Sequence, residues 1–149
     1  MKNNYKYEWN AETGTTTCSI ISPLTKNLII ATAQCHSDDF DMSNKLTGED
    51  IAIRRLDIKI LQDYVKNWLK PGLAALKQLY YTMKHSSKYS PRGYEAKRLY
   101  RQIKIYEEEI EVCQEEIAFQ KADLHQLILK KDAFYKSIRN KRKAIKPNV

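Results

Sequence analysis

The sequence predicts an α+β fold, a small N-terminal antiparallel β-meander followed by two long antiparallel α-helices, assembled as a homo-oligomer. Three short runs of β-branched and aromatic residues lie near the N-terminus, and apolar residues then recur at helical spacing almost to the end of the chain. With 149 residues, the chain has the length of a single domain. We expect the meander and a loop over residues 1–48, a first helix over 49–84 and a second over 90–146.

Three strands are predicted within the meander. Residues 5–10 alternate large apolar with polar side chains and lead into a turn. Residues 15–21 are mostly β-branched until Ser22 and Pro23 end the run, and residues 28–33 form a third apolar run. Because three short strands are not stable alone, the helices must cover one face of this sheet.

The first helix is expected to begin near Glu49, because Thr47 and Asp50 have the spacing of a capping box. Pro71 and Gly72 interrupt the apolar pattern, which predicts a kink or a short break near Pro71. The main apolar positions at helical spacing are Ile53, Leu56, Ile60, Tyr64, Trp68, Leu76, Leu79 and Met83. Four further residues, Leu61, Val65, Leu69 and Leu73, widen this apolar face.

The second helix is the longest element that the sequence predicts. Ser90 suits the N-cap and Pro91 the first helical position, and no further proline occurs until Pro147. Seam residues follow at alternating steps of four and three, a mean spacing of about 3.5 that is typical of a coiled coil. The seam consists of Leu99, Ile103, Tyr106, Ile110, Cys113, Ile117, Gln120, Leu124, Leu127, Lys131, Phe134 and Ile138. A helix of this length spans about 80 Å, so something outside its own core must cover part of it.

If the two helices fold back on each other, their register follows from counting residues. Residue 84 would lie beside residue 91, and residue 49 beside about residue 126. The end of the second helix then has no partner within the pair, and its apolar side chains must meet the sheet or another subunit. These side chains are Phe134, Tyr135 and Ile138. We therefore expect a homo-oligomer, at least a dimer.

The net charge of +8 is distributed in alternating blocks. Residues 84–104 and 130–149 carry +6 and +7, whereas residues 105–129 carry −6. A protein that grips duplex nucleic acid would show one continuous basic stripe, because its affinity comes from many phosphate contacts. Two compact basic zones suit small anionic ligands or staggered helices of different subunits, and we expect no duplex nucleic acid as a partner.

The sequence also carries signals about the compartment. No apolar run approaches the roughly 18 residues of a membrane span, and residues 1–4 open no signal peptide. We expect a soluble intracellular protein that contacts no membrane. Cys18, Cys35 and Cys113 have no metal-like spacing and are expected to be small buried residues in a reducing compartment.

The first candidate site is the turn between the helices with the first turns of the second helix. A helix N-terminus offers free N–H groups and a positive dipole end, and Lys97 and Arg101 stand one turn apart beside it. Aromatic rings beside cations suit a nucleotide, because rings stack on the base and cations bind the phosphates. The alternative is a solvated basic helix face with tyrosines over a hinge. The residues of this zone are Tyr80, Tyr81, His85, Lys88, Tyr89, Ser90, Arg92, Tyr94, Lys97, Arg98 and Arg101.

Arg54 and Arg55, early in the first helix, form the second candidate site. The predicted register puts Arg55 beside about residue 120, roughly 30 Å from Arg101 along the pair, so the two sites are separate within one subunit. The alternative is that both arginines neutralise the acidic belt of residues 107–116, an arrangement of little energetic weight.

The remaining polar clusters point to no chemistry. A histidine and several carboxylates before and at the start of the first helix match no recognised ligand spacing, so no metal is predicted. They are His36, Asp38, Asp39, Asp41, Glu49 and Asp50. The basic tail of residues 139–146 could bind nucleic acid or an acidic neighbour, yet cations at a helix C-terminus also oppose the dipole. Because no glycine-rich phosphate loop and no nucleophile elbow occur, we expect neither an enzyme nor a cofactor.

Four features occur in a recognisable order along the chain. They are the run Tyr7-Glu8-Trp9-Asn10-Ala11-Glu12-Thr13-Gly14, a His-x-Asp loop at His36, the run Gly48-Glu49-Asp50-Ile51-Ala52-Ile53-Arg54-Arg55-Leu56, and the two long helices. In this order the chain resembles the phage Thoeris anti-defence sponge proteins. The resemblance implies a non-enzymatic protein of the infected bacterial cytoplasm that sequesters cyclic ADP-ribose isomers, such as glyco-cyclic ADP-ribose, and starves the Thoeris effector. It also implies dimers or hexamers and, in some members, separate pockets for cyclic di- or trinucleotides of CBASS signalling.

The same resemblance assigns roles to individual residues. Arg55 matches the arginine of the family's Ile-Ala-x-x-Arg run, which places Arg54 and Arg55 in the pocket for cyclic oligonucleotides. Tyr80 stands where an aromatic ring stacks on adenine, and Lys97 and Arg101 match a basic pair that grips the pyrophosphate. The ADP-ribose-type pocket would comprise Tyr80, Ser90, Lys97, Arg98 and Arg101.

Two other classes of function remain open from the sequence. A coiled-coil phage adaptor, or a direct protein inhibitor of a bacterial defence enzyme, would use the seam itself as its partner surface. A nucleic-acid-binding protein would instead lose affinity for generic duplex steeply as the salt concentration rises.

Overall fold

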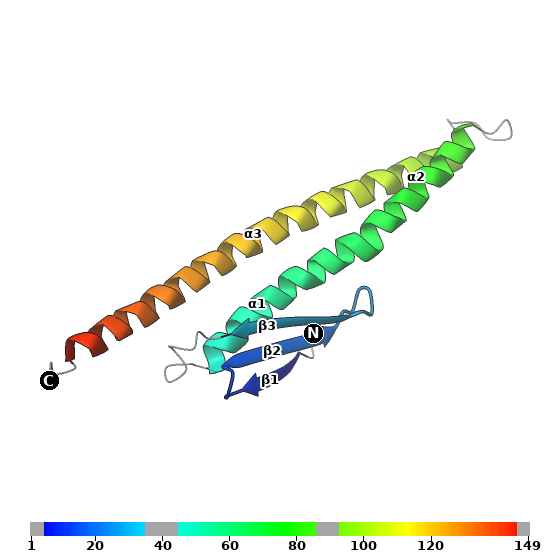
Figure 1. Cartoon of the computed structure of the whole chain (residues 1–149). Helices are drawn as coiled ribbons and strands as arrows, with labels where there is room; N and C mark the ends of the chain where they lie inside the picture. The colour runs from blue at the N-terminus through cyan, green and yellow to red at the C-terminus, as the bar shows by residue number, and fades with distance from the viewer. Residues whose placement is uncertain (1–4, 35–44, 86–92, 146–149) are drawn as a thin grey trace. The chain divides into compact units, whose positions relative to one another are not determined.

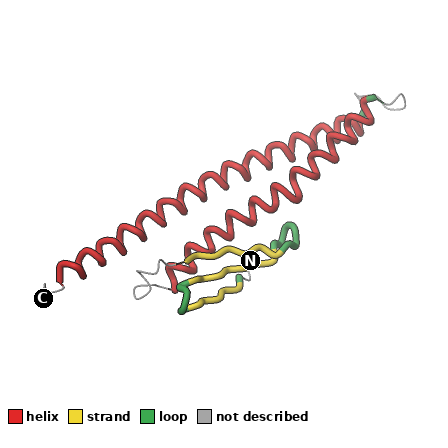
Figure 2. Tube along the Cα trace, viewed as in Figure 1, coloured by secondary structure: helices red, strands yellow, loops and turns green. Residues whose placement is uncertain are grey.

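The computed structural model describes residues 5–34, 45–85 and 93–145 of the chain. Three strands come first, β1 (Lys6–Asn10), β2 (Thr15–Ile21) and β3 (Leu28–Gln34) (Figure 1). The helices follow as α1 (Lys45–Tyr64), the π-helical segment η2 (Val65–Leu69), α2 (Lys70–Lys84) and α3 (Tyr94–Ile145). Figure 2 shows the same succession of strands and then helices. The predicted fold class, an antiparallel sheet followed by long helices, is confirmed.

The chain forms two compact units. Unit 1 contains residues 1–22, 26–59 and 119–149, and therefore the sheet, the first part of α1 and the last part of α3. Unit 2 contains residues 23–25 and 60–118, and therefore the end of α1, η2, α2 and the first part of α3. None of the described helices combines the length and the apolar character that crossing a bilayer requires.

The sheet of unit 1 has the order β1-β2-β3, and both neighbouring pairs are antiparallel. Its side chains alternate between two faces, as the period of a strand requires. The buried face carries Thr16, Cys18 and Ile20 of β2, with Ile29 and Ala31 of β3. On α1 the deeply buried residues are Ile51, Ala52 and Leu56. The helix thus supplies the cover that three short strands need.

The first helix begins at Lys45 and not near Glu49, so the predicted start is wrong by about one turn. Gly48 consequently lies inside the helix, where a Cβ atom would overlap the side chain of Thr16 on β2. The absence of a side chain at Gly48 allows the helix and the sheet to approach closely. A capping box is recognised from four neighbouring residues, so this long-range contact between Gly48 and Thr16 could not be predicted from it.

Unit 2 is held by apolar contacts between its helices. Val65, Leu69 and Cys113 form a buried cluster, and five partly buried side chains pack against it. They are Leu61, Tyr64, Tyr106, Ile110 and Ile117. The burial expected of cysteines is confirmed for Cys18 and Cys113, whose thiol pKa values are raised by burial, while Cys35 lies outside the described residues.

The helical pair of unit 2 is antiparallel. The Tyr64 hydroxyl donates a hydrogen bond of 2.7 Å to Glu109, and further along the same helix Tyr80 meets Tyr100 with ring centroids 6.2 Å apart. Residue numbers thus rise on one helix as they fall on the other, in the sense that the predicted fold-back requires. Desolvation and the bond to Glu109 raise the pKa of Tyr64 to about 12.

The break expected near Pro71 appears one turn earlier, as η2. The N–H of Lys70 donates to the carbonyl of Val65, the i to i−5 bond of a π-helix. Pro71 has no N–H to donate and its ring crowds the preceding turn, which favours a wider turn before it. Around this turn Leu69, predicted on the wider apolar face, is 1% exposed, whereas Trp68 of the main apolar pattern is 53% exposed.

The predicted seam of α3 is largely the side that is buried. Ile103, Cys113 and Leu124 are buried. Near the C-terminus the pattern slips by one residue, because Tyr135 is 4% exposed and Phe134 is 61% exposed. An α-helix has about 3.6 residues per turn and drifts by about 20° per heptad against a repeat of 3.5, which accounts for the slip. Tyr135, one of the side chains expected to meet the sheet or another subunit, is thus covered within the single chain, whereas Phe134 exposes its apolar surface.

Candidate functional site

Unit 2 contains a cavity of about 350 Å³ at the position predicted for an ADP-ribose-type pocket. Tyr80 reaches it from α2, and the other lining residues come from the first turns of α3. They are Ala96, Lys97, Tyr100 and Arg101. Their spacing places them on two adjacent ridges of one helix face, because residues four apart lie one above the other. We call this space the Tyr80 cavity.

Two tyrosine rings form the aromatic part of the Tyr80 cavity. The rings of Tyr80 and Tyr100 are tilted by 48°, with centroids 6.2 Å apart. Because they touch each other in this tilted way, a flat ligand would stack on the open face of one ring and would not insert between them. The ammonium group of Lys104 lies 5.3 Å from the centroid of Tyr100 and adds positive charge beside the rings.

The two cations of the Tyr80 cavity differ from their neighbours in their partners. Within the described part of the chain, Lys97 and Arg101 form no ion pair, and both side chains are exposed. By contrast, Arg98 lies 3.7 Å from Glu95 and Lys104 lies 4.0 Å from Glu107. The charges of Lys97 and Arg101 are therefore available to an anion without the loss of an internal partner.

The start of α3 adds a weaker positive contribution. The helix begins at Tyr94, and its first intrahelical bond runs from the N–H of Lys97 to the carbonyl of Gly93 over 3.1 Å. The positive end of the helix dipole thus lies within about one turn of the Tyr80 cavity. Ser90, predicted as the N-cap and as a pocket residue, lies outside the described residues together with Lys88, Tyr89, Pro91 and Arg92.

Several other predicted residues of this zone lie elsewhere. Arg98 does not line the Tyr80 cavity and is engaged with Glu95. The rings of Tyr81 and His85 contact each other at the C-terminal end of α2, with centroids 4.3 Å apart and a tilt of 53°. The sequence reasoning had missed Tyr100 and Ala96. The helical spacing could have identified both residues, because Ala96 and Tyr100 lie on the same face of the helix as Lys97 and Arg101 once α2 is known to run alongside.

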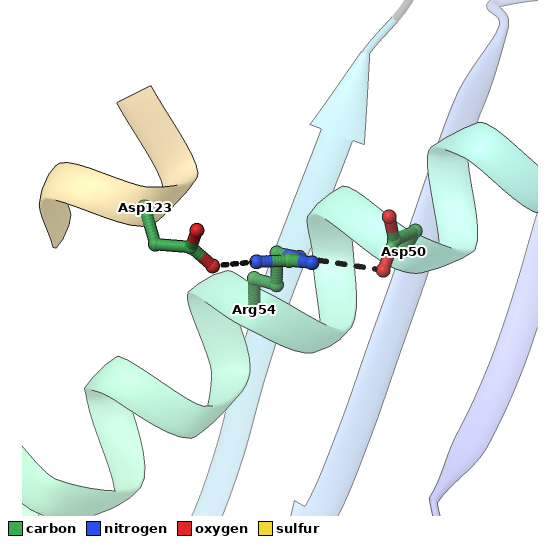
Figure 3. Close-up of polar contacts among 3 residues, drawn as sticks. All are labelled: Asp50, Arg54 and Asp123. Carbon is green, nitrogen blue, oxygen red and sulfur yellow. Dashed lines mark hydrogen bonds and ion pairs between the residues drawn. The ribbon is translucent and has the colours of Figure 1, made fainter. Parts of the chain in front are cut away.

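Arg54 occupies a different environment in unit 1. Its guanidinium lies between two carboxylates, with Nε 3.4 Å from Asp50 and Nη1 bonded to Asp123 of α3 (Figure 3). Burial lowers the pKa of Arg54, but the two carboxylates outweigh burial and raise it. The adjacent cavity, of about 340 Å³, is also lined by Asp57. Three carboxylates against one guanidinium make this space unfavourable for a phosphate.

Arg55 points away from Arg54 and toward the sheet. Its Nη1 donates a hydrogen bond of 2.7 Å to the carbonyl of Thr32 on β3. The two neighbouring arginines are thus not brought together into one pocket. Their partners also lie outside the acidic belt of residues 107–116, which was the alternative role predicted for them.

The remaining candidate clusters add no further site. Among the described residues, no group of three or more His, Cys, Asp or Glu side chains is arranged to hold a metal ion. The loop that carries His36, Asp38, Asp39 and Asp41 lies outside those residues. Comparison with known proteins adds no identity, because no family model, curated protein or solved structure matches the chain.

Proposed function

We propose that the chain is a phage anti-defence protein that binds cyclic ADP-ribose isomers in the Tyr80 cavity and sequesters them without degradation. One observation supports this proposal above the others. The cavity combines a tyrosine pair with two cations, Lys97 and Arg101, that have no carboxylate partner among the described residues. The site of action would be the cytoplasm of the infected bacterium.

The chemistry of the lining matches the two ends of such a ligand. Adenine is a flat ring that stacks on tyrosine, and the pyrophosphate carries charges that Lys97 and Arg101 can bind. The Cβ atoms of residues one turn apart are about 5–6 Å from each other, so both cations can reach one pyrophosphate. Arg101 can bind it through a bidentate fork, whereas Lys97 acts as a point charge.

The size of the Tyr80 cavity favours a site completed by a second copy. Its volume of about 350 Å³ is at the low end of the roughly 300–1,000 Å³ of small-molecule sites. Unit 2 also exposes more than half of several large apolar side chains, which suits self-association. They are Trp68, Leu79, Ile105 and Val112. We propose a homo-oligomer, a dimer or hexamer, as the sequestering species.

Sequestration acts by mass action and requires no turnover. The protein has to be at least as abundant as the signal molecule and has to bind it more tightly than the effector does. Blocking of the Thoeris effector then follows from the fall in free ligand. Binding of cyclic di- or trinucleotides at Arg54 and Arg55 stays a prediction, and such a ligand would have to compete with Asp50, Asp123 and the carbonyl of Thr32.

Calorimetric titration with cyclic ADP-ribose isomers tests the proposal. Arg101→Ala and Lys97→Ala should each weaken binding about 10- to 100-fold, because a charged hydrogen bond contributes about 1.5–3 kcal/mol. Arg98→Ala is the matched control, since it removes a neighbouring cation that does not line the cavity. Equal losses in all three variants would show that only general positive charge matters.

A release experiment separates sequestration from hydrolysis. The protein is incubated with ligand and denatured by heat, and the supernatant is analysed. Recovery of the intact cyclic molecule supports sequestration, whereas linear ADP-ribose would make the protein a hydrolase.

The exposed apolar side chains favour one alternative, a protein that binds a defence enzyme or a phage component directly. Such an adaptor or inhibitor would use Trp68, Leu79, Ile105 and Val112 as its contact surface. Its activity should survive Arg101→Ala and fall with Trp68→Ala or Val112→Asp. The proposed sponge predicts the opposite result for Arg101→Ala.

A further inference from the structure

The two edge strands of the sheet in unit 1, β3 and β1, differ in whether side chains bind their outward backbone groups. Along β3, two side chains of α1 bind backbone carbonyls, with Lys59 Nζ 2.7 Å from the oxygen of Ile30 and Arg55 Nη1 2.7 Å from that of Thr32. A cation that caps an edge carbonyl occupies the position that the N–H of an added strand would need. The β3 edge is therefore protected against further pairing, and Figure 1 shows α1 running alongside it.

The backbone direction at β1 follows from the register of the sheet. The N–H of Ser22 donates 2.8 Å to the carbonyl of Asn27, so this is a hydrogen-bonded pair. Hydrogen-bonded and non-bonded pairs alternate along an antiparallel ladder. Thr17 and Ser19, opposite Thr32 and Ile30, are thus non-bonded toward β3 and turn their backbone groups toward β1. The carbonyls of Ile30 and Thr32 support this assignment independently, because they point away from β2 and accept bonds from Lys59 and Arg55.

The same alternation fixes which groups of β1 face outward. Lys6 and Glu8 lie opposite Ser19 and Thr17 and form the bonded pairs with β2. Tyr7 and Trp9 therefore direct their N–H and C=O groups to the open side of the sheet. Among the described residues, no side chain forms a hydrogen bond to these groups, and Tyr7 as a whole residue is 39% exposed. An exposed, uncapped edge strand is a template for another strand.

We propose that β1 pairs antiparallel with β1 of a second copy, with Tyr7 opposite Tyr7 across a two-fold axis. This register fits the alternation of hydrogen-bonded and non-bonded pairs, because the outward N–H and C=O groups of the two tyrosines can bond to each other. The contact is isologous and closes on itself, so it gives a defined dimer step and no open fibre. The continuous sheet would then contain both three-stranded sheets.

Charge selects this register over its neighbours. Centring on Tyr7 places Lys6 of each copy directly opposite Glu8 of the other, which forms two favourable pairs on one face. Centring on Lys6 or on Glu8 would instead bring that residue opposite its own copy, and like charges directly opposite are destabilising. On the other face, Trp9 would lie opposite Tyr5, an aromatic cross-strand pair.

Sedimentation of the ligand-free full chain tests the pairing through its charges. Lys6→Glu should weaken the dimer step about tenfold or more, because two attractive pairs become repulsive. The double variant Lys6→Glu with Glu8→Lys should restore it, since the opposite charges have only exchanged places. Wild-type association by both variants, or loss of association by the double variant, would overturn the proposal. A monomeric wild-type chain at micromolar concentration would also overturn it.

Two further variants probe the backbone and the register. Tyr7→Pro removes an N–H that faces away from β2, so it should abolish the dimer step while circular dichroism still shows a folded chain. Tyr7→Cys should form a disulfide-linked dimer on mild oxidation, because Cα atoms of opposed bonded residues lie about 5.5 Å apart. Thr17→Cys, on the central strand, is the control and should cross-link no faster than wild type. Equal cross-linking of the two cysteine variants would contradict the register.

These measurements are independent of nucleotide binding, because they use ligand-free protein and residues remote in sequence from the Tyr80 cavity. A failure of Arg101→Ala to weaken ligand binding would leave the β1 result unchanged, and the reverse also holds.

Discussion

Gly72 offers a test in which two effects of opposite sign compete. It lies inside α2, where alanine is favoured over glycine by about 1 kcal/mol of helix propensity. On propensity alone, Gly72→Ala should stabilise the protein. The structure predicts the opposite, because a Cβ atom at Gly72 would lie 2.6 Å from Cε2 of Tyr106 and 3.4 Å from its Cδ2.

The magnitude follows from how far the ring must move. Ordinary van der Waals contact begins at 3.4 Å, so the ring of Tyr106 has to retreat by roughly 0.8 Å. Tyr106 packs against the buried cluster of Val65, Leu69 and Cys113, which restricts that movement. Forcing an extra carbon into a packed site costs about 1–3 kcal/mol. After subtraction of the propensity gain, Gly72→Ala should destabilise the protein by about 1 kcal/mol, within a range of roughly 0–2.

Urea denaturation followed by circular dichroism, at one fixed protein concentration, measures this change. The decisive comparison is the same substitution in a Tyr106→Ala background, where the obstacle is absent. There Gly72→Ala should stabilise the protein by about 1 kcal/mol. Ala75→Gly, at an exposed position of α2, calibrates the propensity term and should cost about the same amount.

A sign that does not reverse between the two backgrounds would refute the reasoning. If Gly72→Ala stabilised the otherwise unchanged protein by as much as Ala75→Gly destabilises it, the close approach of Tyr106 to α2 would not exist in solution.

Three further predictions concern single polar groups. The pKa of Tyr64, raised to about 12 by burial and by Glu109, lies above its unfolded value near 10, so its stabilisation is complete below pH 10 and is lost between pH 10 and 12. Tyr64→Phe should cost about 1–2 kcal/mol at neutral pH and flatten the stability profile between pH 10 and 12. The hydroxyl of Thr16 is buried without a hydrogen-bond partner among the described residues. Thr16→Val should therefore raise the free energy of unfolding by about 1 kcal/mol in urea, and any loss would reveal an unseen partner. Asp123→Asn breaks the ion pair between Asp123 and Arg54, whose side chains are 53% and 37% exposed respectively. The substitution should lower the free energy of unfolding by less than about 1 kcal/mol, and the difference from wild type should disappear at high salt.

The fold class could be predicted because its signals are local. The β-branched composition of residues 15–21 and the spacing along α3 depend only on near neighbours in the sequence, and the structure shows a strand at the first and a largely buried seam at the second. The start of α1 could not be predicted in this way. Whether Gly48 belongs to a loop or to a helix is decided by its contact with Thr16 on a strand, which no local pattern contains.

The errors along the helices share one physical cause, a change in the rotational position of side chains around the helix axis. Trp68 belongs to the main apolar pattern of the first helix and Phe134 to the seam of the second, yet both are exposed while the residue that follows each of them is buried. A fixed step of four and three describes a helix only while its turns are uniform. At Trp68 the π-helical turn adds a residue, and at Phe134 the drift of a regular helix accumulates over several heptads.

The candidate site was predicted as a set of residue types but not as a geometry. Tyr80, Lys97 and Arg101 lie in a zone where aromatic and basic residues occur together near a helix start, and the family resemblance singled them out within that zone. Only the pairing of α2 with α3 shows that Tyr100 joins them and that Arg98 does not. Arg54 and Arg55 illustrate the converse, because adjacent residues on a helix point in different directions and find different partners.

The wide turn of η2 has a consequence for changes in chain length. Leu61, Val65 and Leu69 follow in steps of four and all contact one apolar cluster, although each step of four advances by about 40° around a regular helix. The turn holds one residue more than a uniform helix needs, and its middle residues 66–68 all face solvent. A variant that lacks Asn67 and carries another residue in place of Pro71 could therefore form a regular α-helix through this stretch and keep the same side toward α3. In a helix of uniform turns, deletion of one residue rotates all later side chains by about 100°, whereas here the deletion would replace the wide turn by a regular one.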